Sequence, residues 1–484
     1  SDQVWTVAQF NADCDGGSDG FSNLNCENYA EQNVNLQSFG ASQMNFNTLS
    51  PIELQQVNTC QFDSGTNNAL DCKNDGIIDV KVETRGPGEA NVELENPHGD
   101  PVLFQFNECN DLQNGACENI SANIFEVLKQ GSNSNIEQTN VDWEINQYNH
   151  CDDRVSGSQS CINQGIMSGT NDFDGKDLSL LGLANSIVYV SAQGANSQVI
   201  KADPDGFLTM ENDCDNNRST GNCVNSALNE ALFLAKSGST IDIDRVTQES
   251  TTENSCDNLR NNRDCTNNGY NTFQALATTG ATIDIGNVGS KQTQTLYNDC
   301  NNANCLNDAL NIIQLAANDG AVISTTTGSS GLVQNADFTN TCTSRATCNN
   351  IGTNSITITA TGLNSDVDIS KLQQNLKLTN TCSGGSTTCT NNVLNNVNID
   401  NINSGATITA SANQDITKTN TFTSGTHTYA EQNTINVMKT NAGSLSFSYT
   451  QTASPTLGGN SITSTDQTGS PTITQTGGQS STFP

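Results

Sequence analysis

The stretch that decides the fold is YNDCNNANCLNDALN, residues 297–311. It holds two cysteines around a short polar loop, with Asn298 two positions before Cys300 and Asn307 two positions after Cys305. A further asparagine, Asn311, follows four positions later. The motif Asn-x-Cys, a variable loop and Cys-x-Asn-x3-Asn recurs along most of the chain, so the sequence indicates an internal repeat.

Eighteen cysteines fall into nine local pairs, and six of the eight separations between successive first cysteines lie between 40 and 46 residues. An even number of closely paired cysteines is typical of disulfides in an oxidising compartment. Structural zinc fits less well, because the gaps vary from four to eleven residues and the chain has only three histidines. The predicted disulfides are Cys14–Cys26, Cys60–Cys72, Cys109–Cys117, Cys151–Cys161, Cys214–Cys223, Cys256–Cys265, Cys300–Cys305, Cys342–Cys348 and Cys382–Cys389.

One asparagine stands two positions after the second cysteine in all nine units. Such residues suit turns, and identical amide side chains stacked at strand spacing form hydrogen-bonded ladders. We therefore predict a turn or ladder role for this set, and the staple at the neck of each loop lets the loop vary in length. The set is Asn28, Asn74, Asn119, Asn163, Asn225, Asn267, Asn307, Asn350 and Asn391.

A tenth unit lacks cysteines. Phe422 stands 40 residues after Cys382, and Tyr429 stands at the spacing expected for the equivalent of Cys389. We predict that this aromatic pair replaces the disulfide with an apolar contact.

Period-two patterns, such as SITITA at 355–360, predict strands, and a glycine followed three positions later by isoleucine predicts a turn into another strand. Residues 227–235 and 309–316 have helix-forming composition, but equivalent repeats should share one backbone, so strand is favoured with short helices as the alternative. The predicted fold is all-β: a β-solenoid-like array of about ten units of roughly 42 residues. The alternative is a chain of cysteine-stapled hairpins in an antiparallel sheet or sandwich.

The predicted organisation has four parts. Residues 1–161 form four acidic cysteine-pair repeats, 162–205 an irregular insertion, and 206–440 five cysteine-pair repeats plus the aromatic one. Residues 441–484 form a tail rich in Ser, Thr and Gly, which we expect contacts with a neighbouring subunit to order.

The charge is −33, and it is uneven. Residues 301–484 hold nine acidic and five basic residues, which leaves 42 and 13, or −29, for residues 1–300. This balance argues against nucleic acid as a partner. With 33% hydrophobic residues, the chain suits a thin core shared along a repeat better than several globular cores, and it has no apolar run long enough for a membrane span. The start at Ser1, without a leader, favours a mature exported protein.

No catalytic motif is found, so we expect no enzyme and no cofactor other than opportunistic calcium. The enzymatic alternative is a solenoid that cleaves polysaccharides with stacked carboxylates, for which Asp242 and Asp284 hold equivalent positions. Of the acidic loops, we name the one with Asp172, Asp174 and Asp177 as the calcium candidate, although it lacks a closing Glu. Asn217, in an Asn-Arg-Ser sequon inside a loop, is the candidate for glycosylation.

The units around Cys300–Cys305 and Cys342–Cys348 resemble those of archaeal cell-surface repeat proteins of the methanogen sheath and envelope-filament type. The resemblance covers about residues 1–440. It implies an extracellular structural subunit that assembles with itself, and with other components of the cell envelope, into a resistant covering. An extracellular adhesin or carbohydrate-binding β-rod is the alternative.

Overall fold

The structure is a computed structural model. It describes residues 5–15, 24–40, 43–47, 52–61, 70–85, 89–93, 102–110, 114–130, 135–139, 141–153, 158–165, 185–193, 198–202, 204–216, 223–257, 264–301, 304–325, 331–343, 347–383, 388–401, 405–422, 426–439, 444–453, 458–466 and 472–475. These residues are all-β, with no helix among them, and they form two large parallel sheets.

Sheet A holds seventeen of the described strands and sheet B holds twelve. The strands of sheet A are β1 (Trp5–Asp15), β3 (Gln43–Asn47), β4 (Ile52–Gln61), β6 (Glu89–Glu93), β7 (Val102–Asn110), β9 (Asn135–Thr139), β10 (Val141–Asp153), β13 (Gln198–Ala202), β14 (Pro204–Asn216), β16 (Thr240–Asp257), β18 (Thr282–Asn301), β20 (Val322–Thr325), β21 (Leu332–Thr343), β23 (Asp366–Ser383), β25 (Thr407–Phe422), β27 (Ser444–Ala453) and β29 (Thr472–Gln475). The strands of sheet B are β2 (Leu24–Phe39), β5 (Leu70–Arg85), β8 (Asn114–Gln130), β11 (Ser158–Gly165), β12 (Asn185–Gln193), β15 (Cys223–Lys236), β17 (Asp264–Thr278), β19 (Asn304–Asn318), β22 (Thr347–Thr361), β24 (Thr388–Asn401), β26 (Thr426–Lys439) and β28 (Gly458–Asp466).

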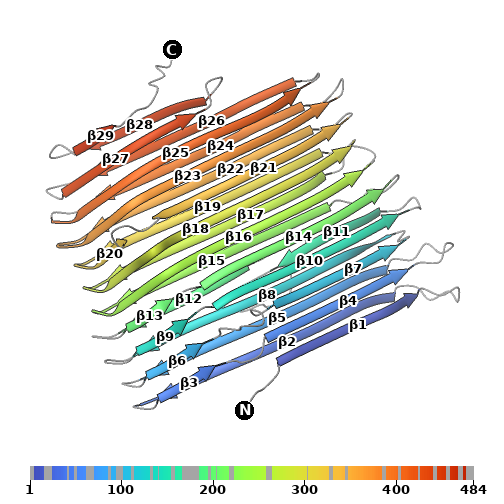
Figure 1. Cartoon of the computed structure of the whole chain (residues 1–484), viewed down its shortest axis with the longest axis horizontal. Coiled ribbons are helices and arrows are strands. Elements are labelled where there is room, and N and C mark those ends of the chain that lie inside the picture. The colour runs from blue at the N-terminus through green and yellow to red at the C-terminus, as the bar shows by residue number, and fades with distance from the viewer. Residues whose placement is uncertain are drawn as a thin grey trace.

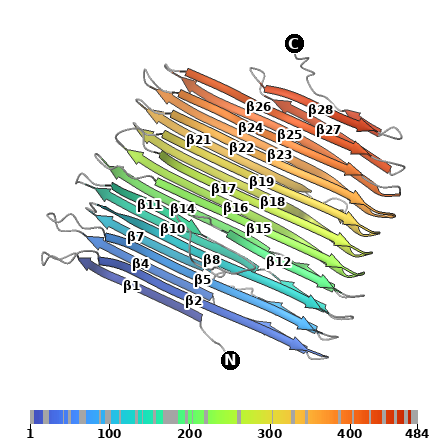
Figure 2. The same cartoon turned by 180° about the vertical axis from the view of Figure 1, so that it is seen from behind.

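The chain passes repeatedly from one sheet to the other, and each strand pairs with its counterpart in the neighbouring units. Ile283 on β18, for example, lies between Ile241 on β16 and Ile323 on β20. The two ends of the described chain lie at opposite ends of the stack (Figures 1 and 2). The alternative of antiparallel stapled hairpins is wrong, because the described strand pairs are parallel, with the two strands around each cysteine loop in different sheets.

The turn from sheet B into sheet A explains the recurring glycine. Thr279 and Gly280 both have positive φ, 56° and 69°, and Ala281 N donates to Thr278 O at 3.3 Å. Two consecutive left-handed residues closed by this hydrogen bond define a type I′ turn, which glycine adopts without steric cost. The next turn stacks on this one, because Gly280 N donates to Asp319 O at 3.1 Å.

The segment with helix-forming composition, residues 227–235, lies in β15 and shows why the pattern of burial overrides propensity. Ala231, Phe233 and Ala235 are buried, while Leu232 and Leu234 between them are only partly covered. This alternation has the period of a strand, and the parallel pairing with β17 satisfies the backbone. The prediction of strand is confirmed here and for residues 309–316, which lie in β19.

The core lies between the two sheets, where inward side chains of both meet. Ile283 and Ile323 from sheet A belong to the same apolar cluster as Phe273 and Leu315 from sheet B. A second, smaller apolar cluster surrounds Phe338, nearer the cysteine loops. Buried asparagines and glutamines lie among these apolar residues, so the interior is mixed rather than purely apolar.

Strands occur both in the segment predicted to be an irregular insertion, 162–205, and in the tail, 441–484. Within 162–205, β12 pairs with β8 and β15, and β13 pairs with β9 and β16, so strands from this segment join both sheets. Within the tail, β28 pairs with β26 and β29 pairs with β27 of the same chain. The ordering of the tail by a neighbouring subunit stays a prediction.

Candidate functional site

The strand register stacks the cysteines into two columns. In sheet A, Cys300 lies between Cys256 and Cys342, and in sheet B, Cys305 pairs in register with its counterparts on both sides. The sheet A column contains Cys14, Cys60, Cys109, Cys151, Cys214, Cys256, Cys300, Cys342 and Cys382. The sheet B column contains Cys26, Cys72, Cys117, Cys161, Cys223, Cys265, Cys305, Cys348 and Cys389.

Disulfides join the two columns across the loop necks. Three of the predicted pairs are formed in the described residues, Cys256–Cys265, Cys300–Cys305 and Cys342–Cys348, with Cα atoms 6.4 to 6.6 Å apart. Cys26, Cys72 and Cys389 are also disulfide-bonded. No cysteine among the described residues is free. Each described staple therefore ties sheet A to sheet B at the same edge of the stack.

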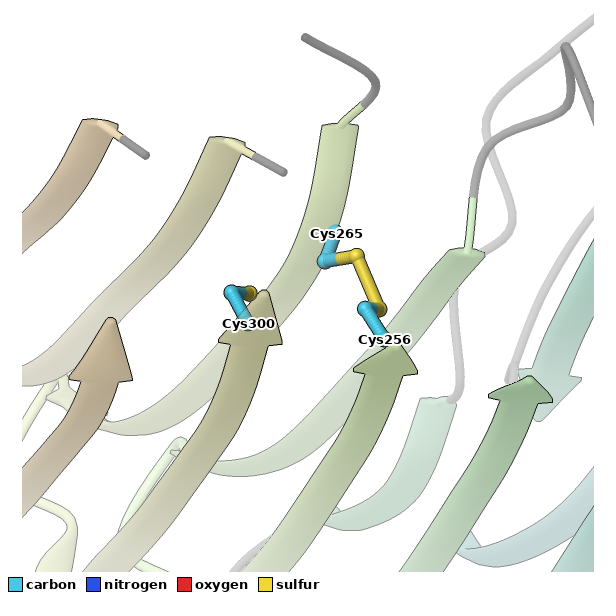
Figure 3. Close-up of side chains that lie close together, drawn as sticks. All are labelled: Cys256, Cys265 and Cys300. Carbon is cyan, nitrogen blue, oxygen red and sulfur yellow. A yellow bond between two sulfur atoms is a disulfide. The ribbon is translucent and has the colours of Figure 1, made fainter. Parts of the chain in front are cut away.

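Neighbouring staples lie close enough to exchange partners. The sulfurs of Cys256, Cys265 and Cys300 all lie within 4.8 Å of one another, as do those of Cys305, Cys342 and Cys348. Figure 3 shows the bonded pair Cys256–Cys265 with Cys300 on the next strand beside it. Three sulfurs at this spacing would also suit a soft metal ion, but here each sulfur is already bonded to its partner in one of the three disulfides.

The strand register corrects the aromatic pair that was predicted for the tenth unit. Phe422 lies opposite Cys382, as predicted, but His427 and not Tyr429 lies opposite Cys389. Tyr429 instead takes the position of Asn391. The error arose because the spacing of the preceding unit was applied to a loop that is two residues shorter.

The asparagines after the second cysteine form a ladder along sheet B. Asn267 Nδ2 donates to Asn307 Oδ1 at 3.1 Å, and Asn307 Nδ2 donates to Asn350 Oδ1 at 3.2 Å. The same bond joins Asn225 to Asn267, Asn350 to Asn391, Asn28 to Asn74, and Asn74 to Asn119, at 2.9 to 3.1 Å. The backbone of Asn163 lies in register between Asn119 and Asn225.

This ladder is also joined to the asparagines before the first cysteine, in sheet A. Asn307 Nδ2 donates to Asn340 Oδ1 at 2.9 Å, and Asn340 Nδ2 donates to Asn350 Oδ1 at 2.8 Å. Because both partners are buried, these bonds satisfy polar groups that would otherwise be costly. The asparagines before the first cysteine and those after the second cysteine therefore form one hydrogen-bonded network that spans both sheets. The sequence did not predict this connection.

A second asparagine ladder follows four positions further along sheet B. Its members are the buried residues Asn229, Asn271, Asn311, Asn354, Asn395 and Asn433, linked at 2.8 to 3.0 Å.

Sequence reasoning also missed two glutamine ladders in sheet A. One runs through Gln9, Gln56, Gln105 and Gln147, and the other through Gln248, Gln292, Gln334, Gln374 and Gln414, at 2.8 to 3.1 Å. The signal was present, because each member of the second ladder stands eight positions before Cys256, its counterparts or Phe422.

The two kinds of ladder point in opposite directions. The two asparagine ladders of sheet B donate toward the unit that follows in sequence, as from Asn267 to Asn307 and from Asn271 to Asn311. The two glutamine ladders of sheet A donate toward the unit that precedes in sequence, as from Gln334 to Gln292. The stack therefore has a chemical polarity that distinguishes its two ends.

Burial raises the pKa of several carboxyl groups on the outer faces of the sheets. We call these the shielded carboxyls, and they are Asp75, Glu230, Asp308, Asp366 and Asp400. Partial loss of water around the charged form is the main cause for each.

The other predicted sites are placed as follows. Asp242 and Asp284 lie opposite each other, and Ser324 Oγ donates to Asp284 Oδ1 at 3.1 Å, so that carboxylate has a donor from a neighbouring strand. The calcium candidates Asp172, Asp174 and Asp177 and the glycosylation candidate Asn217 lie outside the described residues.

Comparison of the chain with protein-family models, curated proteins and solved structures finds no match. A search of the described residues for an apolar helix of membrane-spanning length is also negative.

Proposed function

We propose that this chain is a structural subunit of an extracellular self-assembling polymer, such as a cell sheath, filament or surface layer. In this proposal the chain winds as a β-solenoid, with one coil for each cysteine pair and for the aromatic unit. The parallel pairing of each strand with its counterpart roughly 40 residues away supports this winding.

The observation that carries the proposal is the set of columns that run along the stack at right angles to the strands. In-register backbone pairing, stacked amide side chains and alternating inward residues are the features that stabilise cross-β assemblies. They favour a durable rod, and open strands at either end of such a rod are templates for further pairing.

The staples fit a protein outside the cell. Disulfides persist in oxidising compartments. Loop-closure entropy gives each of these short loops about 2 to 2.5 kcal/mol, so a series of them is comparable with the whole stability of an ordinary domain. Such reinforcement suits a part exposed to proteases and mechanical load.

Electron microscopy of the oxidised protein, with sedimentation in physiological salt, tests the proposal. Filaments or sheets are expected, and they should survive urea concentrations that dissolve them once a dithiol reductant is added. Uniform monomers over a wide concentration range would contradict the proposal.

A second candidate, a sugar-binding rod, is favoured by an outer-face column in the acidic part of sheet A. Phe10, Val57, Phe106 and Tyr148 lie side by side in register, with the ring of Phe104 5.8 Å from that of Tyr148. Aromatic faces of this kind suit the apolar faces of sugar rings. Pull-down by insoluble polysaccharides tests it: Phe106→Ala should abolish binding without lowering the urea midpoint, and an unchanged pull-down would remove this candidate.

A further inference from the structure

Sheet A is built from short strands followed by long ones. In the described residues, β3 precedes β4, β6 precedes β7, β9 precedes β10, β13 precedes β14 and β20 precedes β21, and elsewhere the two merge into one continuous strand. At the C-terminal end of the stack, β29 is a short strand on the outer edge of β27, with no long strand beyond it among the described residues. At the other end, β1 is a long strand with no short strand before it among those residues.

Measured from the sheet A cysteine column, the end of β29 and the start of β1 lie at nearly the same position along the strand direction. Gln475, the last residue of β29, pairs with Tyr449, which pairs with Ala412, ten positions before Phe422. Trp5, the first residue of β1, pairs with Ile52, eight positions before Cys60. Since Phe422 and Cys60 belong to the same column position, β1 would begin two positions beyond the last residue of β29, with one position between the two strands.

Sheet B matches in the same register. Asn460 on β28 pairs with Asn433, which stands six positions after His427, in the second asparagine column. On β2, Gln32 stands six positions after Cys26 and is buried. An edge-to-edge contact in unbroken register would therefore place an amide against an amide and continue this column across the junction.

We propose that a second copy of this chain docks head to tail, with its β1 completing the coil that β29 begins and its β2 pairing with β28. This inference rests on the proposed function and specifies its contact. The junction repeats the parallel pairing of the rest of the stack, so each added subunit presents the same open edge as the last.

Two features disfavour the head-to-head arrangement. Asn28 Oδ1 receives no hydrogen bond from the described residues, although Asn28 donates through Nδ2 to Asn74, so the N-terminal edge presents an acceptor. Two such edges would oppose acceptor to acceptor. They would also bring together two N-terminal parts, each with a charge of −29 over residues 1–300.

Site-specific photocrosslinking of the assembled, oxidised full chain tests the inference. Tyr29 on β2 is 55% exposed, so Tyr29→p-benzoylphenylalanine keeps an aromatic side chain at the edge. Its matched control is Ile351→p-benzoylphenylalanine, because Ile351 is 38% exposed in the middle of the stack and, like Tyr29, stands three positions after its cysteine. Mixing isotopically labelled and unlabelled protein identifies crosslinks between copies.

The expected result is crosslinks between copies from position 29 to peptides that contain β28, absent with the probe at position 351. Crosslinks from position 29 to β1 or β2 of another copy would overturn the head-to-tail contact and leave the polymer intact, as would polymer that crosslinks only through position 351. Complete absence of assembly for the unsubstituted chain would remove both the polymer and its contact.

Discussion

Replacing Asn307 by alanine should lower the free energy of unfolding by about 3 to 4 kcal/mol, because this buried side chain is a node of the network between the sheets. It takes part in five hydrogen bonds. Its Nδ2 donates to Thr339 O, Asn340 Oδ1 and Asn350 Oδ1 at 3.2, 2.9 and 3.2 Å, and its Oδ1 accepts from Asn267 and Asn298 at 3.1 and 2.8 Å.

The magnitude follows from what is lost and what remains. A buried hydrogen bond contributes about 1 kcal/mol net. The three donor contacts share two N–H groups, so the five bonds count as about four. Asn267 keeps Tyr297 O and Asn298 keeps Leu306 O as acceptors, so these donors are not left unsatisfied.

Aspartate at the same position separates the amide donor from simple loss of the side chain. Asn307→Asp removes both N–H donors and sets a carboxylate against the acceptors Asn340 Oδ1 and Asn350 Oδ1. At pH 7 it should cost about 2 kcal/mol more than the alanine variant. Since burial raises the pKa of such a carboxyl, the difference should shrink as the pH falls below that pKa.

Urea unfolding of the oxidised protein, followed by circular dichroism, gives these values. The matched control is Asn349→Ala, because Asn349 is only partly buried and should change the free energy by less than about 0.5 kcal/mol. The reasoning is refuted if Asn307→Asp is as stable as Asn307→Ala at pH 7, or if Asn307→Ala behaves like the control.

Three further outcomes are expected. A Cβ on Gly352 would lie 2.4 Å from Phe338 Cζ, so Gly352→Ala should cost about 1 to 3 kcal/mol in urea unfolding and be partly rescued by Phe338→Leu; no rescue would argue against this clash. In Cys265→Ser, the freed Cys256 thiolate should attack Cys300, forming a Cys256–Cys300 disulfide and releasing the former partner of Cys300 as a thiolate, and peptide mass mapping that finds only the original bond would contradict this. The folded state binds protons more readily than the unfolded chain at the shielded carboxyls, so stability should rise as the pH falls from about 7 toward 4, and a lower urea midpoint at pH 5 than at pH 8 would count against it.

The repeat could be found from the sequence because cysteines and their flanking asparagines occupy fixed offsets from one another. The register that pairs Cys300 with Cys256 and Cys342 is the register that this alignment implies. Whether neighbouring strands pair in parallel or antiparallel was harder to predict. The motif of Asn-x-Cys followed by Cys-x-Asn fits a hairpin within one sheet as well as a turn between two sheets. Only contacts between distant units distinguish parallel from antiparallel pairing.

Two further misses have local causes. The glutamine ladder was overlooked because Gln292 and Gln334 stand far from the cysteines that defined the repeat, in segments whose other residues vary. The position of Tyr429 was wrong because spacing inside a loop carries no register information once a staple isolates the loop. The register is fixed instead by the strands on each side of the loop, where Asn395 and Asn433 correspond.

The opposed ladders have an electrostatic consequence for a long stack. Each row of aligned amide groups is a row of dipoles, and such rows sum to partial charges at their ends, as backbone dipoles do in a helix. Because the glutamine row between Gln248 and Gln414 runs against the asparagine row between Asn229 and Asn433, the two fields subtract. The partial charge at each end of the stack is then smaller than parallel rows would give, and the dipole moment grows less with each added coil.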